Sequence, residues 1–196
     1  MRLAVLLLLA LSWSLTAAAQ TPAVWLTDKG TVKFHADSPM QAIDATSQVG
    51  TFVYDGKGGF VGSVAMSSFE FTNGLLRSHF NESYLESEKP GPADAAGKPT
   101  FPYQLAVVTG KLVAPLDTTK PGPVEVSLKA RFTCHGVTVE RVVRGTVTPQ
   151  GDTMALKVKF DLAPKDFGIP LPTIGDAPMF QTVEVTVEGT LRRQPG

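Results

Sequence analysis

The segment VEVSLKARFTC, residues 124–134, decides the fold, because apolar and polar side chains alternate along it without a break. Successive side chains of a β-strand point to opposite faces of the sheet, so a period of two predicts a strand with one buried face. The same alternation recurs at residues 154–162 and 183–191. The sequence therefore favours long antiparallel strands with one face in a core and the other in water.

Turn sequences separate these strands. His135-Gly136 and Gln150-Gly151-Asp152 are typical of tight turns, and the glycine cluster at 55–59 is typical of a hairpin. A strand, not a helix, is expected after that cluster, so it does not predict a phosphate-binding loop. Further strands are expected at residues 32–36, 48–54, 59–71, 100–110 and 137–147.

One segment has helical spacing. Leu76, Phe80 and Tyr84 recur every four residues, Asn73 is a suitable N-cap, and the run ends before Pro90. One helix beside about eight strands predicts an all-β fold, a single antiparallel β-barrel, because closure removes the exposed edges of a sheet. A sandwich of two sheets is the alternative.

Composition excludes several classes of protein. The chain has 196 residues, of which 43% are hydrophobic, so it can bury a core and is not typical of a disordered chain. Eighteen Lys and Arg balance eighteen Asp and Glu, which provides no basic field for nucleic acid. A single cysteine cannot form a disulfide within the chain.

The first residues are typical of a secretory signal. Met1-Arg2 precedes an apolar run from Leu3 to Leu15, and Ala17-Ala18-Ala19 provides the small residues that signal peptidase cleaves after. The run is shorter than the roughly 20 residues of a membrane-spanning helix. We therefore expect a signal peptide at 1–19, cleavage near Ala19/Gln20, and one soluble domain at 20–196 in the periplasm or outside the cell.

The segment HFNESYLES, residues 79–87, closely resembles the helix motif of the YceI-like family, in particular its HFNENYMES branch. SSFEFTNGL at 67–75 and DFGIP at 166–170 are also similar to that branch, and the resemblance extends over about residues 32–191. It implies a lipocalin-like barrel with a short helix near the mouth, whose interior takes up a polyisoprenoid or related lipid. The segment Glu88–Pro99 is longer than in the family pattern, and is either a lid or unordered.

A barrel of about eight strands is either filled by side chains or holds one small ligand, and periodicity alone leaves both open. The inward positions are mostly Val, Ala, Gly and Leu, which favours free space. The candidate wall residues are Phe34, Phe69, Phe71, Leu76, Phe80, Tyr84, Phe101, Tyr103, Leu105, Leu128, Phe132 and Phe160.

Three polar residues are candidates for the mouth. His79 and Glu82 lie three residues apart on the helix, but no third or fourth metal ligand accompanies them, so we expect no metal. Arg141 falls on the apolar face of its strand. Either a bulge or a snorkelling side chain takes it out of that face, or it caps the cavity and meets a ligand head group.

No catalytic arrangement is evident. Cys134 and His135 are neighbours on a strand, so their side chains point to opposite faces and cannot act as nucleophile and base. We expect no enzyme and no cofactor, but an exported carrier or scavenger of one long apolar lipid: a polyisoprenoid, an isoprenoid quinone or a fatty-acid-like molecule. Its further partners would be a membrane or a membrane electron-transfer protein, or a second copy of the chain. The alternative is a structural or protein-interaction barrel with a filled core.

Overall fold

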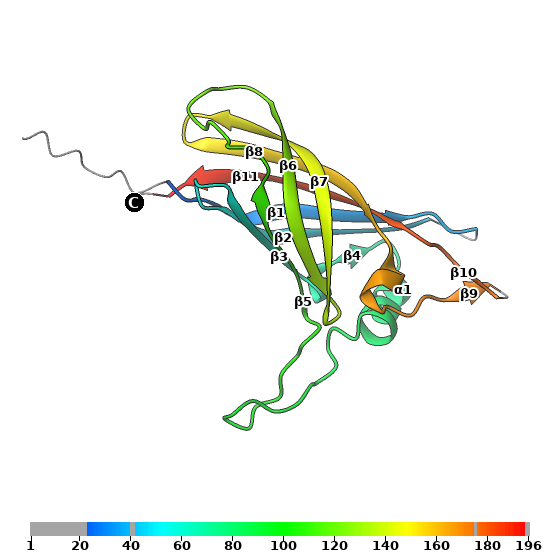
Figure 1. Cartoon of the computed structure of the whole chain (residues 1–196). Helices are drawn as coiled ribbons and strands as arrows, with labels where there is room; N and C mark the ends of the chain where they lie inside the picture. Colours follow the sequence, from blue (N-terminus) through cyan, green and yellow to red (C-terminus); the bar gives the residue numbers. More distant parts are fainter. Residues whose placement is uncertain (1–22, 40–41, 175, 195–196) are drawn as a thin grey trace, which may run out of the picture.

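The computed structural model describes residues 23–39, 42–174 and 176–194, so the predicted signal peptide lies outside the described residues. Within the described residues, one sheet of nine antiparallel strands has the order β1-β11-β8-β7-β6-β5-β3-β2-β4, and eight of them, all except β4, form the barrel wall (Figure 1). Because β1 also pairs with β2, this sheet closes into a barrel. The eight strands are β1 (Trp25–Ala36), β2 (Ile43–Tyr54), β3 (Gly59–Ala65), β5 (Leu105–Leu112), β6 (Val124–Cys134), β7 (Val137–Gln150), β8 (Thr153–Leu162) and β11 (Val183–Arg193). The predicted barrel is confirmed, and the sandwich alternative is wrong.

Shorter elements lie at one end of the barrel (Figure 1). Strand β4 (Glu70–Phe71) pairs with β2 and leads into helix α1 (Gly74–His79), which continues as a wider helical turn, Phe80–Tyr84. The hairpin of β9 (Thr173–Ile174) and β10 (Ala177–Pro178) projects from the same end. Short 3₁₀ turns occupy Met66–Ser68 and Pro164–Phe167. No helix within the described ranges is both long and apolar enough to cross a membrane.

The predicted turns are confirmed. His135 and Gly136 join β6 to β7 with φ angles of 49° and 76°, the left-handed pair that a two-residue hairpin turn requires. Gly151 and Asp152 join β7 to β8. In the β2–β3 hairpin, the carboxylate of Asp55 accepts hydrogen bonds from the backbone N–H groups of Lys57 and Gly59.

Two predicted strands are shorter than alternation suggested. The strand expected at 59–71 stops at Ala65, where the hydroxyl of Ser68 donates to the Ala65 carbonyl and closes a 3₁₀ turn. The strand expected at 100–110 begins only at Leu105. Pro102 lies in the lost part, and a proline has no N–H to give to a sheet ladder.

The segment Glu88–Pro99 does not cover the barrel end. It projects beside α1 as an arm (Figure 1), closed by a bridge between Ala93 and Pro99 and by the Gly91 N–H donating to Thr100. The lid expected as one alternative for this segment is therefore not observed, and the arm is ordered by its own backbone pairing.

The ring of Phe52, near the end of β2, takes up part of the barrel interior. The residue is 3% exposed, and its ring lies against Gly30, Gly50, Gly62 and Gly189, which come from four different strands. A Cβ atom added at Gly30 would lie 2.1 Å from a ring carbon of Phe52, far inside van der Waals contact. These glycines therefore provide the space in which an aromatic ring fits between closely spaced strands.

We predict that Gly30→Ala destabilises the protein, because the new methyl group must displace the Phe52 ring that lies against Gly30. Overpacking of this kind costs about 1–3 kcal/mol. Gly74→Ala is the matched control, since an added Cβ at Gly74 meets nothing within 4 Å. The free energy of unfolding in urea measures both, and equal stability of the two variants would contradict the packing described here.

Candidate functional site

The barrel encloses a cavity of about 430 Å³. This volume is within the range of about 300–1,000 Å³ that small-molecule pockets have. The wall is formed by alternate side chains of the long strands, since every second side chain of a β-strand points to the same face of the sheet. On β6, β8 and β11 these wall side chains include Val126, Leu128, Phe132, Leu156, Val158, Phe160, Val183, Val185 and Val187.

Four phenylalanines form a cluster at the end of the cavity next to α1. Phe34 comes from β1, Phe71 from β4, Phe69 from the turn before it, and Phe80 from the helical segment. The Phe80 ring stacks on Phe34 with centroids 5.2 Å apart and lies 4.9 Å from Phe71 and 6.0 Å from Phe69. Such ring pairs contribute about 0.5–1.5 kcal/mol each beyond the area they bury. Phe80 therefore anchors the helix to the barrel.

The conformation of the helical segment follows from its sequence. The Asn73 side chain accepts from the Leu75 N–H at 2.9 Å, as predicted for the N-cap. Further along, the Leu85 N–H donates to the carbonyl of Phe80, five residues earlier. This bond closes a π-helical turn, which is wider than an α-helical one and is often found at functional sites. The buried Asn81 donates to the Arg77 carbonyl and accepts from the Ser87 hydroxyl at 2.7 Å.

The cavity brings together most of the predicted wall residues. Those that line it are Phe34, Phe69, Phe71, Leu76, Phe80, Tyr84, Leu128, Phe132 and Phe160. Their contact with a ligand stays a prediction. The residues Phe101, Tyr103 and Leu105 lie outside the lining. Phe101 and Tyr103 precede the strand, and within it Ala106 and Val108 face inward, which places Leu105 on the opposite face. Phe101 and Leu105 are 39% and 44% exposed, and Tyr103 packs on His135, with ring centroids 4.4 Å apart.

Of the polar mouth candidates on the helix, His79 lines the cavity and Glu82 is exposed outside it. Across the described residues, no group of three or more His, Cys, Asp and Glu side chains is arranged to hold a metal ion. The rim of the cavity next to His79 is completed by Leu171, Pro172, Met179 and Phe180, from the segment that carries the β9–β10 hairpin.

Arg141 is held by an ion pair. The β6–β7 register runs without a shift and places Arg141 opposite Ala130, so the bulge considered for this position is wrong. The half-exposed guanidinium donates to the Asp166 carboxylate, and Phe167 beside it is 2% exposed. Gly168 then turns the chain with φ of 66°. The ion pair between Arg141 and Asp166 thus holds the 3₁₀ turn Pro164–Phe167 against β7. Arg141 itself lies outside the cavity lining.

Sequence reasoning did not select several residues that line the cavity around Phe52. Phe52, Tyr54 and Phe60 belong to strands that were expected, and their alternation marks an inward face. Met154 and Leu191 line the same region and also lie on predicted apolar faces. The signal that could have found all five is the same period of two, applied to every inward position and not only to selected aromatic residues.

The interior of an eight-stranded antiparallel barrel is either filled by side chains or holds one small ligand, and this barrel has free interior space. No protein-family model and no curated protein sequence matches the chain. Solved structures match in fold. The polyisoprenoid-binding domain from Saccharophagus degradans, implicated in plant cell wall breakdown, aligns at 13% identity and a TM-score of 0.68 over 88% of this chain and 99% of its own.

Two further structures are similar. BcnA of Burkholderia cenocepacia aligns at 9% identity and a TM-score of 0.61, covering 83% of this chain and 96% of its own. A variant of the Campylobacter jejuni YceI protein with a monobromobimane guest aligns at 9% identity and a TM-score of 0.52, with both chains fully covered. This chain therefore has the fold of the YceI-like, lipocalin-like barrels, as the resemblance of its helix motif implied.

Cys134 provides a reporter inside the cavity. Its side chain lines the wall, and burial raises the pKa of the thiol to about 11. We predict that it reacts with DTNB at pH 8 about 100-fold more slowly than in protein unfolded in guanidinium chloride, because the thiolate fraction falls tenfold per unit of pKa. The rate should rise as pH rises toward 11, where the thiol ionises. Equal rates in native and unfolded protein would place Cys134 outside the cavity.

Proposed function

We propose that this chain is a member of the YceI-like family that carries one long apolar lipid inside its barrel and performs no covalent chemistry. The observation that carries the proposal is the hollow interior: a cavity of about 430 Å³ whose wall is built mainly from Val, Leu, Ile, Met and Phe side chains. A polar ligand would lose its hydrogen bonds with water in such a wall and gain few in return. The fold neighbour from Saccharophagus degradans, a polyisoprenoid-binding domain, supports the choice of an isoprenoid chain.

The energetics of burial fit a long hydrocarbon cargo. Burying one methylene group contributes about 0.8 kcal/mol, so a five-carbon isoprene unit contributes on the order of 4 kcal/mol. Association and immobilisation cost about 4–15 kcal/mol. Several units are needed before binding becomes tight, so affinity should rise with chain length. An isoprenoid quinone or a fatty-acid-like molecule meets the same requirement.

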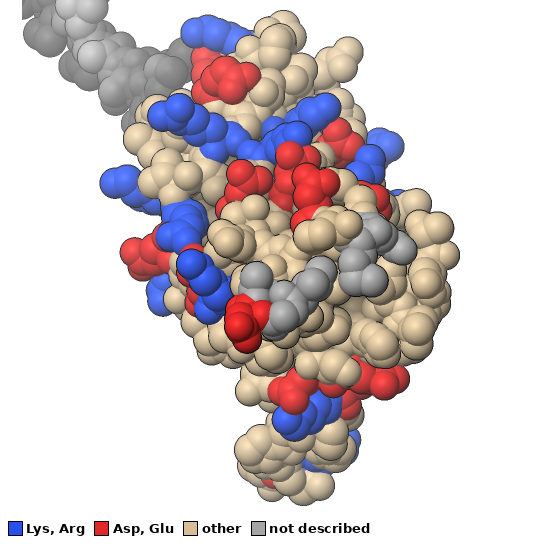
Figure 2. All heavy atoms as spheres, turned by 90° about the vertical axis from the view of Figure 1, so that its right-hand side faces the viewer, with Lys and Arg blue, Asp and Glu red and all other residues tan. Residues whose placement is uncertain are grey.

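Export is the second part of the proposal. A cleaved signal at residues 1–19 would deliver the barrel to the periplasm or the cell exterior, where an insoluble lipid needs a carrier between membranes. The cavity rim formed by α1 and by Leu171, Pro172, Met179 and Phe180 would then be the end that meets the lipid donor. Figure 2 views this end of the molecule and shows charges of both signs around uncharged surface. Leu75, on α1, is 63% exposed there, as a transient membrane contact would require.

We predict that the protein incubated with a polyprenol retains one molecule of it in native mass spectrometry, and that longer polyprenols are retained more strongly. Leu128→Trp should abolish this retention while the protein stays folded, because the larger side chain occupies the middle of the cavity. Lys129→Trp is the matched control, since Lys129 is exposed on the outer face of the same strand. It should retain the lipid.

A bare protein mass with every polyprenol tested would contradict the carrier proposal and favour a structural or protein-interaction role. Global unfolding of Leu128→Trp, seen by circular dichroism, would mean that the space around Leu128 is already filled. Equal loss of lipid in both tryptophan variants would place the binding site outside the barrel.

A further inference from the structure

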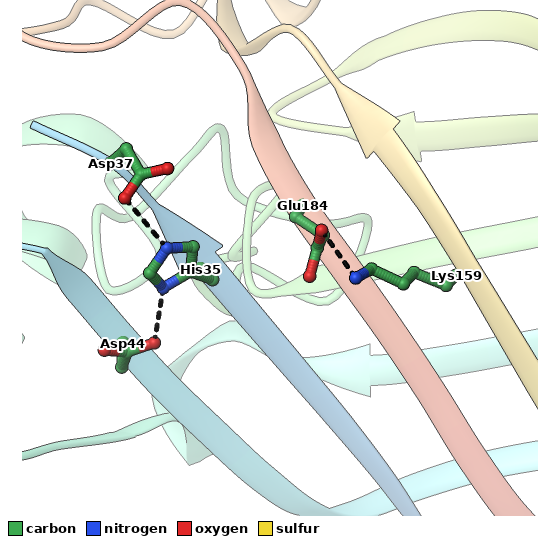
Figure 3. A network of polar contacts seen from close by, with 5 residues as sticks. All are labelled: His35, Asp37, Asp44, Lys159 and Glu184. Atoms are coloured by element: carbon green, nitrogen blue, oxygen red, sulfur yellow. Dashed lines mark hydrogen bonds and ion pairs between the residues drawn. The ribbon is translucent and has the colours of Figure 1, made fainter.

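His35 lies between two carboxylates where β1 ends and β2 begins (Figure 3). Its Nδ1 atom is 2.7 Å from Asp44 Oδ1, on β2. Its Nε2 atom is 3.1 Å from Asp37 Oδ1, just beyond the end of β1. Both contacts are within hydrogen-bond distance, so the ring links the two strands and the start of their connection.

The protonation state of the ring decides whether both links exist. A neutral imidazole has a single N–H, and ionised carboxylates only accept, so a neutral His35 can bond to one of the two aspartates. The imidazolium ion donates from both nitrogens. The hydrogen bond to Asp44, followed by that to Asp37, raises the pKa of His35 above its ordinary value of 6.5. Because the folded pKa is raised, the double link is complete below pH 6.5 and is lost as pH rises through the folded pKa.

The charged groups around the ring reinforce this preference. Glu184, on β11, is the cross-strand neighbour of His35, and its carboxylate pairs with Lys159 of β8 at 2.8 Å (Figure 3). Lys33, two residues back on β1, is 3.8 Å from Glu188. Glu188 also pairs with Lys157 of β8 at 3.2 Å. On the β2 side of the ring, the next charged residue is Glu70 of β4, which pairs with Thr46 of β2. The nearby lysines are thus paired with Glu184 and Glu188, while Asp37 and Asp44 both face the histidine.

The link is connected to the cavity wall through adjacent residues. Phe34, next to His35, points inward and stacks on Phe80, the ring that anchors the helix. Ile43, next to Asp44, also lines the cavity. Residues of a strand alternate between faces, so fixing His35 and Asp44 outside fixes the inward positions of Phe34 and Ile43.

We propose that His35 is a pH-sensitive clamp at the cavity mouth, which ties β1 to β2 when its ring is an imidazolium and loosens this part of the wall when it is neutral. At acidic pH the wall is held and the cargo exchanges slowly, whereas at alkaline pH the wall opens more often and the cargo exchanges faster. The effect on cargo rests on the proposed function, but the clamp itself does not.

The clamp is tested without any ligand, by hydrogen exchange of peptides that contain Phe34 and Ile43, at pH 5.5 and pH 8.5 after correction for the intrinsic exchange rate. Protection in the natural protein should fall about two- to tenfold at the higher pH, the loss expected for one exposed hydrogen bond. His35→Gln should show no such fall, because glutamine does not titrate. Lys33→Gln, which removes a neighbouring charge, should keep it. Equal protection at both pH values, or the same fall in His35→Gln, would overturn the clamp.

The effect on cargo has a separate measurement. The dissociation rate of a fluorescent polyene fatty acid should increase severalfold from pH 5.5 to pH 8.5 in the natural protein and stay constant in His35→Gln. A pH-independent rate in the natural protein would overturn the control of exchange, even with the clamp intact. If the probe fails to bind at all, the proposed function is wrong, and hydrogen exchange still decides the clamp.

Discussion

The closure of the sheet through β1 is the constraint on which the rest of the structure depends. Strand β1 pairs with β2 on one side and with β11 on the other, so every strand of the barrel has two neighbours. The alternating side chains then have only two environments, solvent and an enclosed interior. An apolar residue placed on the inner face stabilises the barrel whether it meets another side chain or a bound hydrocarbon. That freedom allows a barrel to be stable and hollow together.

The two ends of the interior differ in how they are filled. Toward one end the ring of Phe52 packs against glycines of four strands and takes up part of the interior. At the other, four phenylalanines join the helix to the strands, and the helix is held mainly through Phe80. Between them the wall carries smaller aliphatic side chains such as Val126 and Val158. An apolar space of this kind stays dry, so it favours a hydrocarbon over water.

The sequence predicted the barrel and most of the site because both depend on alternation, a local property. Leu128, Phe132 and Phe160 line the cavity for this reason, and their contact with a ligand stays a prediction. Alternation does not show which face of a strand is inside, so in β5 the wall was expected on the side of Leu105, whereas Ala106 and Val108 face the interior. The environment of Arg141 also depends on a distant segment, since its partner Asp166 is 25 residues away. The existence of the cavity depends on how all side chains pack together, which no single segment determines.

The most direct test of the hollow interior is a crystal structure of the protein pressurised with xenon, a gas that occupies dry apolar cavities without needing a specific partner. This account predicts xenon inside the barrel, in contact with side chains such as Val126, Val158 and Val185. An interior in which side chains interlock along the whole axis, with no xenon among them, would contradict it.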